Sequence, residues 1–204
     1  MPTEIPEYNR ISDEELIRRF QEGDALAFDF IVNRYKDQLL NFAYRFVGNI
    51  EEAEDVVQET FLRLYRNRHA YRQIAKFSTW IYTIAGNLSK TELRKRKRRK
   101  LVSISDIGFD EKDYQIEDEH ADTERDVDSV LKEEFIQKAI EELSPRFRQI
   151  IILRDIQELS YEEVGKILKI PLGTVKSRVN RARLKLQAKL QDLDVKKKKN
   201  TRSN

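Results

Sequence analysis

LSYEEVGKILKIPLGTVKSRVNRARLKLQAKLQDL, residues 159–193, is the stretch that decides the fold. Ser160 followed three residues later by Glu163 is typical of a capping box, in which each residue satisfies a backbone N–H of the other. A helix is therefore expected over 161–168, because Pro171 cannot continue it. A turn and a second helix follow, so the stretch predicts a helix-turn-helix.

The second helix should bury one face and present a basic, polar face opposite it. Its apolar residues recur at the helical spacing, at Val175, Val179, Ala182, Leu186 and Leu190. The opposite face and its flanks carry Lys176, Ser177, Arg178, Asn180, Arg181, Arg183 and Lys185. Such a helix suits the major groove of DNA, where base edges lie between two rows of phosphates. An ordinary surface helix with a solvated basic face is the alternative.

Two residues bear on the turn at 169–172. Gly165 has no side chain, which lets the second helix cross the first one closely at this position. Lys169 occupies the position where a helix-turn-helix commonly has glycine, and a left-handed lysine there costs about 1 to 2 kcal/mol. The helices are therefore better defined by the sequence than the turn.

Composition excludes several classes of protein. The chain has 204 residues, 39% of them hydrophobic, with no apolar run long enough to span a membrane and a polar N-terminus unlike a signal peptide. The absence of cysteine removes disulfides, thiolate catalysis and zinc-thiolate sites. We expect a cytoplasmic protein without a cofactor or a metal.

Charge is segregated along the chain although the net charge is only +3. Residues 94–100 are seven consecutive cations, residues 106–134 hold 13 acidic and 3 basic residues, and residues 196–199 are lysines. Blocks of this kind mark nucleic-acid contacts or solvated linkers.

The rest of the sequence predicts an all-α protein, because it has few alternating strand patterns and dense helical spacing. We expect two small helical domains, at 12–100 and 129–193, joined by a flexible acidic linker at 101–128. Residues 1–11 and 194–204 are expected to be disordered. The first helices should be capped by Ser12, in a box with Glu15, and by Asp24, and a later one by Ser78 or Thr79.

Two surfaces of the N-terminal half carry candidate contact residues. On the helix near 51–67, Asp55, Gln58, Glu59 and Leu62 share a face away from the apolar stripe, which a solvated surface would also explain. The loop before the next helix interleaves Tyr71 and Phe77 with Arg72 and Lys76. Rings among cations suit single-stranded bases, which stack on rings and carry phosphates, although the same rings could simply pin the loop to the core.

In chain order these segments resemble a bacterial RNA polymerase sigma factor of the extracytoplasmic-function group, which belongs to the sigma-70 family. The resemblance covers about residues 12–190 and is carried by AEDVVQETFLRLY at 53–65, FSTWIYTIAGNLSKTELRKRKR at 77–98, LSPRFRQIIILRDIQELSYEEVGKIL at 143–168 and IPLGTVKSRVNRARLKL at 170–186. It implies a region 2 domain at 12–100 and a region 4 helix-turn-helix domain at 129–193.

The resemblance also implies partners and site residues. Core RNA polymerase, through its β′ clamp helices and β flap, and promoter DNA are the implied partners, with an anti-sigma factor as a candidate third. Polymerase binding is implied for Asp55, Gln58, Glu59 and Leu62. Capture of the melted minus-ten strand is implied for Tyr71, Arg72, Gln73, Lys76, Asn87, Lys90 and Arg94. Reading of the minus-thirty-five duplex is implied for Thr174, Lys176, Ser177, Asn180, Arg181 and Arg183. The acidic linker would thread the RNA exit path.

Two other functions compete with a promoter-specificity factor. A one-component regulator would need an apolar ligand pocket in the N-terminal half, whose outward groups are instead polar and cationic. An enzyme would need catalytic groups, but the two histidines, His69 and His120, have no recognisable partner spacing and there is no Gly-rich phosphate loop. The sequence therefore favours the sigma factor.

Overall fold

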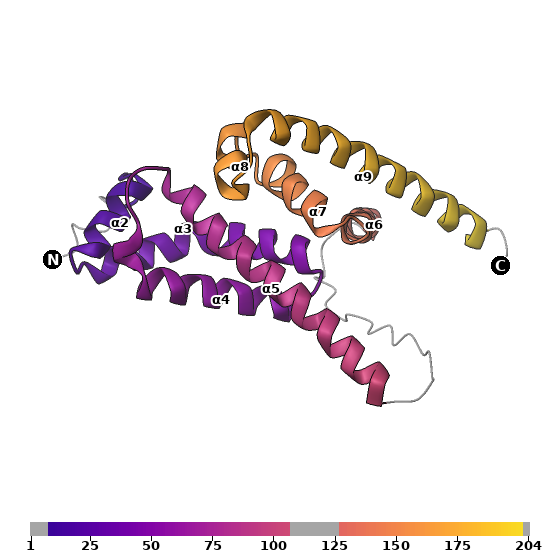
Figure 1. Ribbon diagram of the computed structural model, residues 1–204, viewed down its shortest axis with the longest axis horizontal. Helices are drawn as coiled ribbons and strands as arrows, with labels where there is room; N and C mark the ends of the chain where they lie inside the picture. The colour runs from indigo at the N-terminus through magenta and orange to yellow at the C-terminus, as the bar shows by residue number, and fades with distance from the viewer. Residues whose placement is uncertain (1–7, 107–126, 202–204) are drawn as a thin grey trace.

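The computed structural model describes residues 8–106 and 127–201, and the described part is helical throughout, which confirms the all-α fold class. Two groups of helices lie side by side, α2 to α5 below and α6 to α9 above in Figure 1. The elements are α2 (Asp13–Gln21), α3 (Ala25–Val47), α4 (Ile50–Arg66), the 3-10 turn η1 (Arg68–Ala70), α5 (Phe77–Asp106), α6 (Val127–Glu141), α7 (Pro145–Ile151), the π-helical turn η2 (Ile152–Ile156), α8 (Tyr161–Leu168) and α9 (Leu172–Thr201).

Side-chain caps set where the N-terminal helices begin. Ser12, Asp24 and Asn49 each accept a hydrogen bond from the backbone N–H three residues later, at 3.2, 3.3 and 2.8 Å. Gly48 ends α3 in the left-handed conformation at φ 77°, where glycine carries no steric cost. The expected box at Ser12 is only half formed, because the carboxylate of Glu15 pairs with two arginines instead.

An aromatic core holds α3 and α5 together. Tyr35 and Phe42 of α3 are at most 4% exposed. Their rings meet Phe77 and Tyr82 of α5 edge-on, at centroid distances of 5.5 and 5.4 Å. Each buried aromatic side chain contributes on the order of 1.5 to 3 kcal/mol through its apolar surface. This core fixes α5 across the bundle, so the cationic end of α5 projects beyond it (Figure 1).

The start of α5 differs from the expectation. The helix begins at Phe77, so Ser78 and Thr79 lie inside its first turn and neither is the cap. The backbone N–H of Phe77 donates to the carboxylate of Glu14 on α2 at 3.0 Å. A residue far away in the sequence therefore satisfies the helix end, which local pattern cannot reveal.

The expected linker at 101–128 is partly helical. α5 continues through the run of cations to Asp106, and α6 begins at Val127. Residues 107–126, which include His120 and most of the acidic run, lie outside the described residues.

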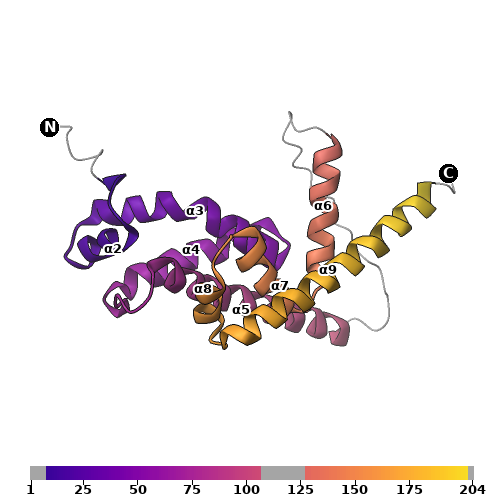
Figure 2. The ribbon, with the colours of Figure 1, turned by 90° about the horizontal axis from the view of Figure 1, so that it is seen from above.

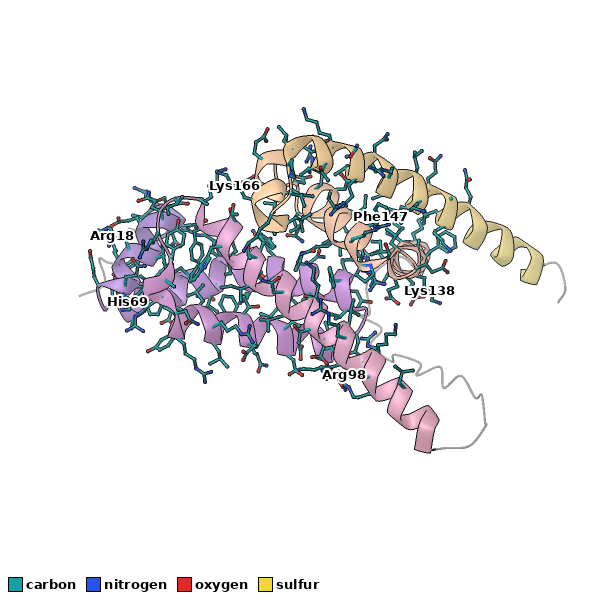
Figure 3. The ribbon with its side chains drawn as sticks, in the orientation of Figure 1. Arg18, His69, Arg98, Lys138, Phe147 and Lys166 are labelled. Atoms are coloured by element: carbon teal, nitrogen blue, oxygen red, sulfur yellow. The ribbon has the colours of Figure 1, made fainter. Side chains whose placement is uncertain are left out.

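The C-terminal helices are organised around α7. Ser144 is the N-cap of α7 and Pro145 its first residue, where proline is favoured because the N–H that it lacks would be unsatisfied there. Phe147 lies between α7 and α9 (Figure 3) and is 7% exposed. Ile136 of α6 is 42% exposed and lies outside this core.

The helix-turn-helix is confirmed. α8 has the complete capping box of Ser160 and Glu163, and Lys169 ends it in the left-handed conformation, at φ 55°. α9 starts at Leu172 and runs to Thr201, past the expected end of the domain near 193. Lysine is a good helix former, and a row of lysines extends a helix that has already begun. In Figure 2, α9 reaches well past the other helices.

The two groups of helices share one apolar core, and polar side chains also connect them. Tyr82 donates its hydroxyl hydrogen to Gln157 Oε1 at 2.6 Å, and Gln157 Nε2 donates to Asn41 Oδ1 at 3.2 Å. Lys76, in the loop before α5, forms an ion pair of 2.9 Å with Glu163 of α8. The loop and the helix-turn-helix are thus directly connected.

Arg148 of α7 makes a buried contact between the groups. The residue is 7% exposed, and its guanidinium donates to the backbone carbonyl of Phe46, at the end of α3, at 2.6 Å. It also donates to the carbonyls of Glu141 and Leu143, which joins α6 and α7 to the same point. Burial lowers the pKa of this guanidinium. A buried charge is costly when it lacks hydrogen-bond partners, so the three carbonyls that accept from Arg148 favour one defined position of α7 on α3.

Candidate nucleic-acid interface

The outer face of α9 has the expected composition and exposure. Val175, Val179 and Ala182 are at most 1% exposed, so the helix is fixed by its apolar side. On the opposite side, the expected duplex contacts Lys176, Ser177, Asn180 and Arg181 are exposed. Thr174, at the edge of this face, is half-buried. This arrangement can offer hydrogen bonds to base edges while cations lie near phosphates.

Two backbone features set the angle of α9. The N–H groups of Lys169 and Ile170 both reach the carbonyl of Gly165, the latter at 3.0 Å. A Cβ at Gly165 would lie 3.2 Å from the carbonyl oxygen of Ile170 and 3.5 Å from Val175. The chain therefore crosses α8 closely at this glycine, as the sequence predicted, and accepts the strain of a left-handed Lys169.

Arg183 differs from the other expected duplex contacts because a protein carboxylate holds it. Its Nε and Nη2 lie 2.9 and 2.6 Å from the two carboxylate oxygens of Asp155. These bonds raise the pKa of the Arg183 guanidinium. The forked pair fixes the direction of Arg183, and the guanidinium remains about half exposed, at 52% for the side chain.

The expectation that Tyr71 offers a free ring is wrong. Tyr71 is 8% exposed, and its ring lies 5.7 Å from that of Phe77 and 5.4 Å from that of Trp80, measured between centroids. Its hydroxyl donates to the carbonyl of Ala75 at 2.8 Å, and burial raises its pKa. The structure thus favours the alternative reading of the ring, which pins the loop to the core.

The tip of the same loop is exposed. Arg72, Gln73 and Lys76 point to solvent, and Ile74 between them is 84% exposed. Ile74 was not among the residues predicted for this site. The signal in the sequence was a single aliphatic residue among polar ones in a loop, which indicates a possible apolar contact with a partner. Tyr71 and its neighbours hold the base of the loop, so its tip is presented on a fixed support.

The outer face of α5 continues from this loop. Asn87 and Arg94 are exposed and Lys90 is half-buried, all on one side of the helix. Burial and the neighbouring charge of Arg94 lower the pKa of Lys90. These residues form a polar, cationic row that leads from the loop toward the run of seven cations.

The face of α4 that was singled out in the sequence lies away from the other helices. Asp55 and Gln58 are exposed, Leu62 is 48% exposed, and Glu59 pairs with Arg63 at 2.7 Å. One helical turn further on, Tyr65 is 50% exposed. The combination of two large apolar side chains with acid and amide groups on one helix suits a protein partner better than a nucleic acid.

The described residues offer little else that suggests chemistry. Within residues 8–106 and 127–201, no three His, Cys, Asp or Glu side chains gather as a site for a metal ion. In the same residues, no helix has both the length and the apolar character to cross a bilayer. His69 is exposed on η1, at the outer edge of the N-terminal helices in Figure 3.

Sequence comparison matches both halves to known families. Residues 31–99 match the family described as Sigma-70 region 2, and residues 135–186 match Sigma-70, region 4. The chain is 39% identical to the ECF RNA polymerase sigma factor SigW of Bacillus subtilis (strain 168) over 193 residues, 87% of this chain and 96% of that relative. It is 34% identical to the ECF RNA polymerase sigma-E factor of Escherichia coli (strain K12) over 187 residues, 90% of this chain and 97% of that relative.

Solved structures agree with the fold. The sigma factor RpoE in complex with the anti-sigma factor NepR, from Bartonella quintana, superposes with a TM-score of 0.63 at 27% identity, covering 80% of this chain and 96% of that one. CnrH in complex with the cytosolic domain of CnrY has a TM-score of 0.68 at 22% identity, covering 89% and 99%, which supports the fold alone. With both regions matched in order and relatives similar along nearly their whole length, the chain belongs to the extracytoplasmic-function group of RNA polymerase sigma factors, non-enzymatic regulators that bind core RNA polymerase and direct promoter-specific transcription initiation.

Proposed function

We propose that α9 reads the minus-thirty-five element of the promoter as duplex DNA. The observation that carries this assignment is the polar face of α9, backed by the buried side chains of Val175, Val179 and Ala182. Asn180 and Arg181 have the donors and acceptors for base edges, whereas Arg183, fixed by Asp155, suits a phosphate. The other residues of this site are Thr174, Lys176 and Ser177.

The loop after η1 and the outer face of α5 are proposed to hold the melted minus-ten strand. Arg72, Gln73 and Ile74 would contact an unstacked base at the loop tip, and Tyr71 supports the loop from below. Asn87, Lys90 and Arg94 would then hold the sugar-phosphate backbone. Lys76 belongs to the same site, but its ion pair with Glu163 must open before it can meet DNA.

The exposed face of α4 is proposed to dock on the β′ clamp helices of core polymerase. Asp55, Gln58, Glu59 and Leu62 form it, and the exposed ring of Tyr65 extends it. The helix-turn-helix domain would contact the β flap. Both contacts are made by helices whose buried faces are fixed independently, so the partner does not need to remodel the fold.

The remaining assignments follow from the family. The chain acts in the bacterial cytoplasm, where promoter DNA and polymerase lie, and it performs no catalysis of its own. The Bartonella relative is bound by an anti-sigma factor, and we propose the same class of partner for this chain.

Selection of DNA by the holoenzyme tests the division of labour between the two sites. Core polymerase with this chain should select two spaced motifs from a random-sequence duplex library. Asn180→Ala should change only the upstream motif, and replacement of residues 72–76 should change only the downstream one. If either variant alters both motifs equally, or neither, the two sites are misassigned.

A further inference from the structure

A basic cleft lies where the helix-turn-helix group meets α5. Its volume is about 460 Å³, and five cationic side chains line it: Lys90, Arg94 and Lys97 from α5, Arg146 from α7, and Arg178 from α9. The cations come from three helices and from both halves of the chain. The cleft therefore exists only while the two groups of helices are docked.

The five cations have no acidic partner in the described part of the chain. Neither an ion pair nor a hydrogen bond to a carboxylate involves any of them, whereas many other arginines on the described surface are paired. Lys90 is half-buried, and both burial and Arg94 lower its pKa, which shows that the site disfavours a further positive charge. Five like charges gathered around one cleft repel one another, and a bound anion would offset that repulsion.

The rest of the lining limits the kind of anion. Leu93 and Leu168 give the cleft an apolar side, and Gln149, which is 3% exposed, adds an amide. Gln149 packs against Gly86 of α5, where a Cβ would collide with its side-chain nitrogen, so this wall is fixed. A cleft of this size and shape does not admit a duplex, which needs an open surface across its grooves.

We propose that this cleft binds a compact anion with several adjacent phosphate groups, which bridges α5 and the helix-turn-helix group and stabilises their docking. Guanidinium groups bind phosphate oxygens in pairs, and neighbouring phosphates can engage cations from both sides at once. The source is a free nucleoside polyphosphate or an inorganic polyphosphate. Lys90 and Arg94 are also the proposed contacts to the promoter strand, so the anion would compete with DNA; this consequence rests on the proposed function, whereas the binding itself does not.

Calorimetric titration of the full chain without polymerase tests the proposal. Inorganic tripolyphosphate, adenosine triphosphate and orthophosphate are compared at one ionic strength and pH. Tripolyphosphate should bind at least about tenfold more tightly than orthophosphate, because it can engage more than one cation. If adenosine triphosphate binds more tightly than tripolyphosphate, the cleft takes a nucleotide on its apolar side; equal or weaker binding identifies an inorganic polyphosphate.

Matched variants separate the cleft from general charge. Arg146→Gln removes an exposed cation of the cleft that has no proposed role in promoter or polymerase binding, and Lys138→Gln removes an exposed cation from α6 outside it. Arg146→Gln should weaken tripolyphosphate binding about five- to tenfold, and Lys138→Gln should leave it within about twofold. Equal losses in both variants, no loss in Arg146→Gln, or no preference for tripolyphosphate over orthophosphate would overturn the proposal. So would binding of an oligothymidylate without binding of tripolyphosphate, which would identify a groove for a nucleic-acid strand.

A chain that does not bind tripolyphosphate would not contradict the proposed contacts with polymerase and promoter, because neither is present in the titration. Conversely, a chain that fails to select promoter motifs could still bind tripolyphosphate.

Discussion

Lys76 Nζ and Glu163 Oε1 lie 2.9 Å apart, and they join the loop proposed to hold the melted strand to the first helix of the helix-turn-helix. Glu163 also closes the capping box of α8 with Ser160. The carboxylate of Glu163 stabilises the charged form of Lys76 and so raises the pKa of its ammonium group. The two elements proposed to bind DNA are therefore connected to each other in the docked chain.

A double-mutant cycle on Lys76→Gln and Glu163→Gln measures this connection. Glutamine at 163 can still complete the capping box, so α8 should keep its helix. Because Lys76 is largely exposed, we expect a coupling of about 0.2 to 1 kcal/mol in urea melts at low salt, decreasing as salt is added. Strictly additive single-variant effects would mean that the pair does not form in solution.

The face of α9 gives the second prediction. Asn180→Ala or Arg181→Ala should cost about 1 to 3 kcal/mol for each lost base contact and relax the preference at that position of the upstream element. Gln187→Ala, an exposed change on the same helix two turns further on, is the control. Quantitative footprinting of holoenzyme on promoters with single-base changes is the measurement. Undiminished discrimination by both variants would show that another surface reads the element.

The α4 patch gives the third. Replacing Asp55, Gln58 and Leu62 by alanine should weaken binding to core polymerase by at least about tenfold, since a buried apolar anchor and its polar neighbours are lost together. A control variant with Leu26→Ala and Asp37→Ala changes an exposed leucine and an exposed acid on α3, outside the patch. Binding is measured with fluorescently labelled chain, alongside thermal melts. If the control weakens binding as much as the triple variant, the patch is an ordinary solvated surface.

The loop gives the fourth prediction, in a form that the structure has changed. Tyr71→Ala should destabilise the fold by about 3 to 5 kcal/mol, as expected for a buried aromatic side chain. Ile74→Ser and Arg72→Ala should instead leave the melting temperature unchanged and reduce opening of the promoter. Permanganate footprinting on the native promoter and on one pre-melted by mismatches separates strand capture from upstream binding. Normal opening by both tip variants would make the loop a structural connection only.

Local signals predicted much of the fold. The caps at Ser12, Asp24 and Ser160 and the stop at Pro171 depend on neighbours within a few residues, and the structure confirms each of these helix ends. The apolar stripe of α9 was likewise visible, because helical spacing alone decides which residues share a face. The left-handed backbone conformation considered for Lys169 is confirmed, at φ 55°.

Signals that depend on distant partners were missed. Rings among cations predict both a stacking platform and an anchored loop, and only the positions of Phe77 and Trp80 show that Tyr71 is an anchor. The same limit applies to Phe77, whose N–H is satisfied from another helix. Docking of the two halves also uses single polar residues such as Gln157 and Arg148, which carry no periodic signal.

Run-off transcription tests the central claim most directly. Purified core polymerase is incubated with a library of promoter fragments, with and without the full chain, and the products are sequenced. We expect discrete transcripts that start at a fixed distance downstream of two shared sequence elements, that require the chain, and that are lost in the Asp55, Gln58 and Leu62 triple variant. Identical transcripts with and without the chain would contradict this claim.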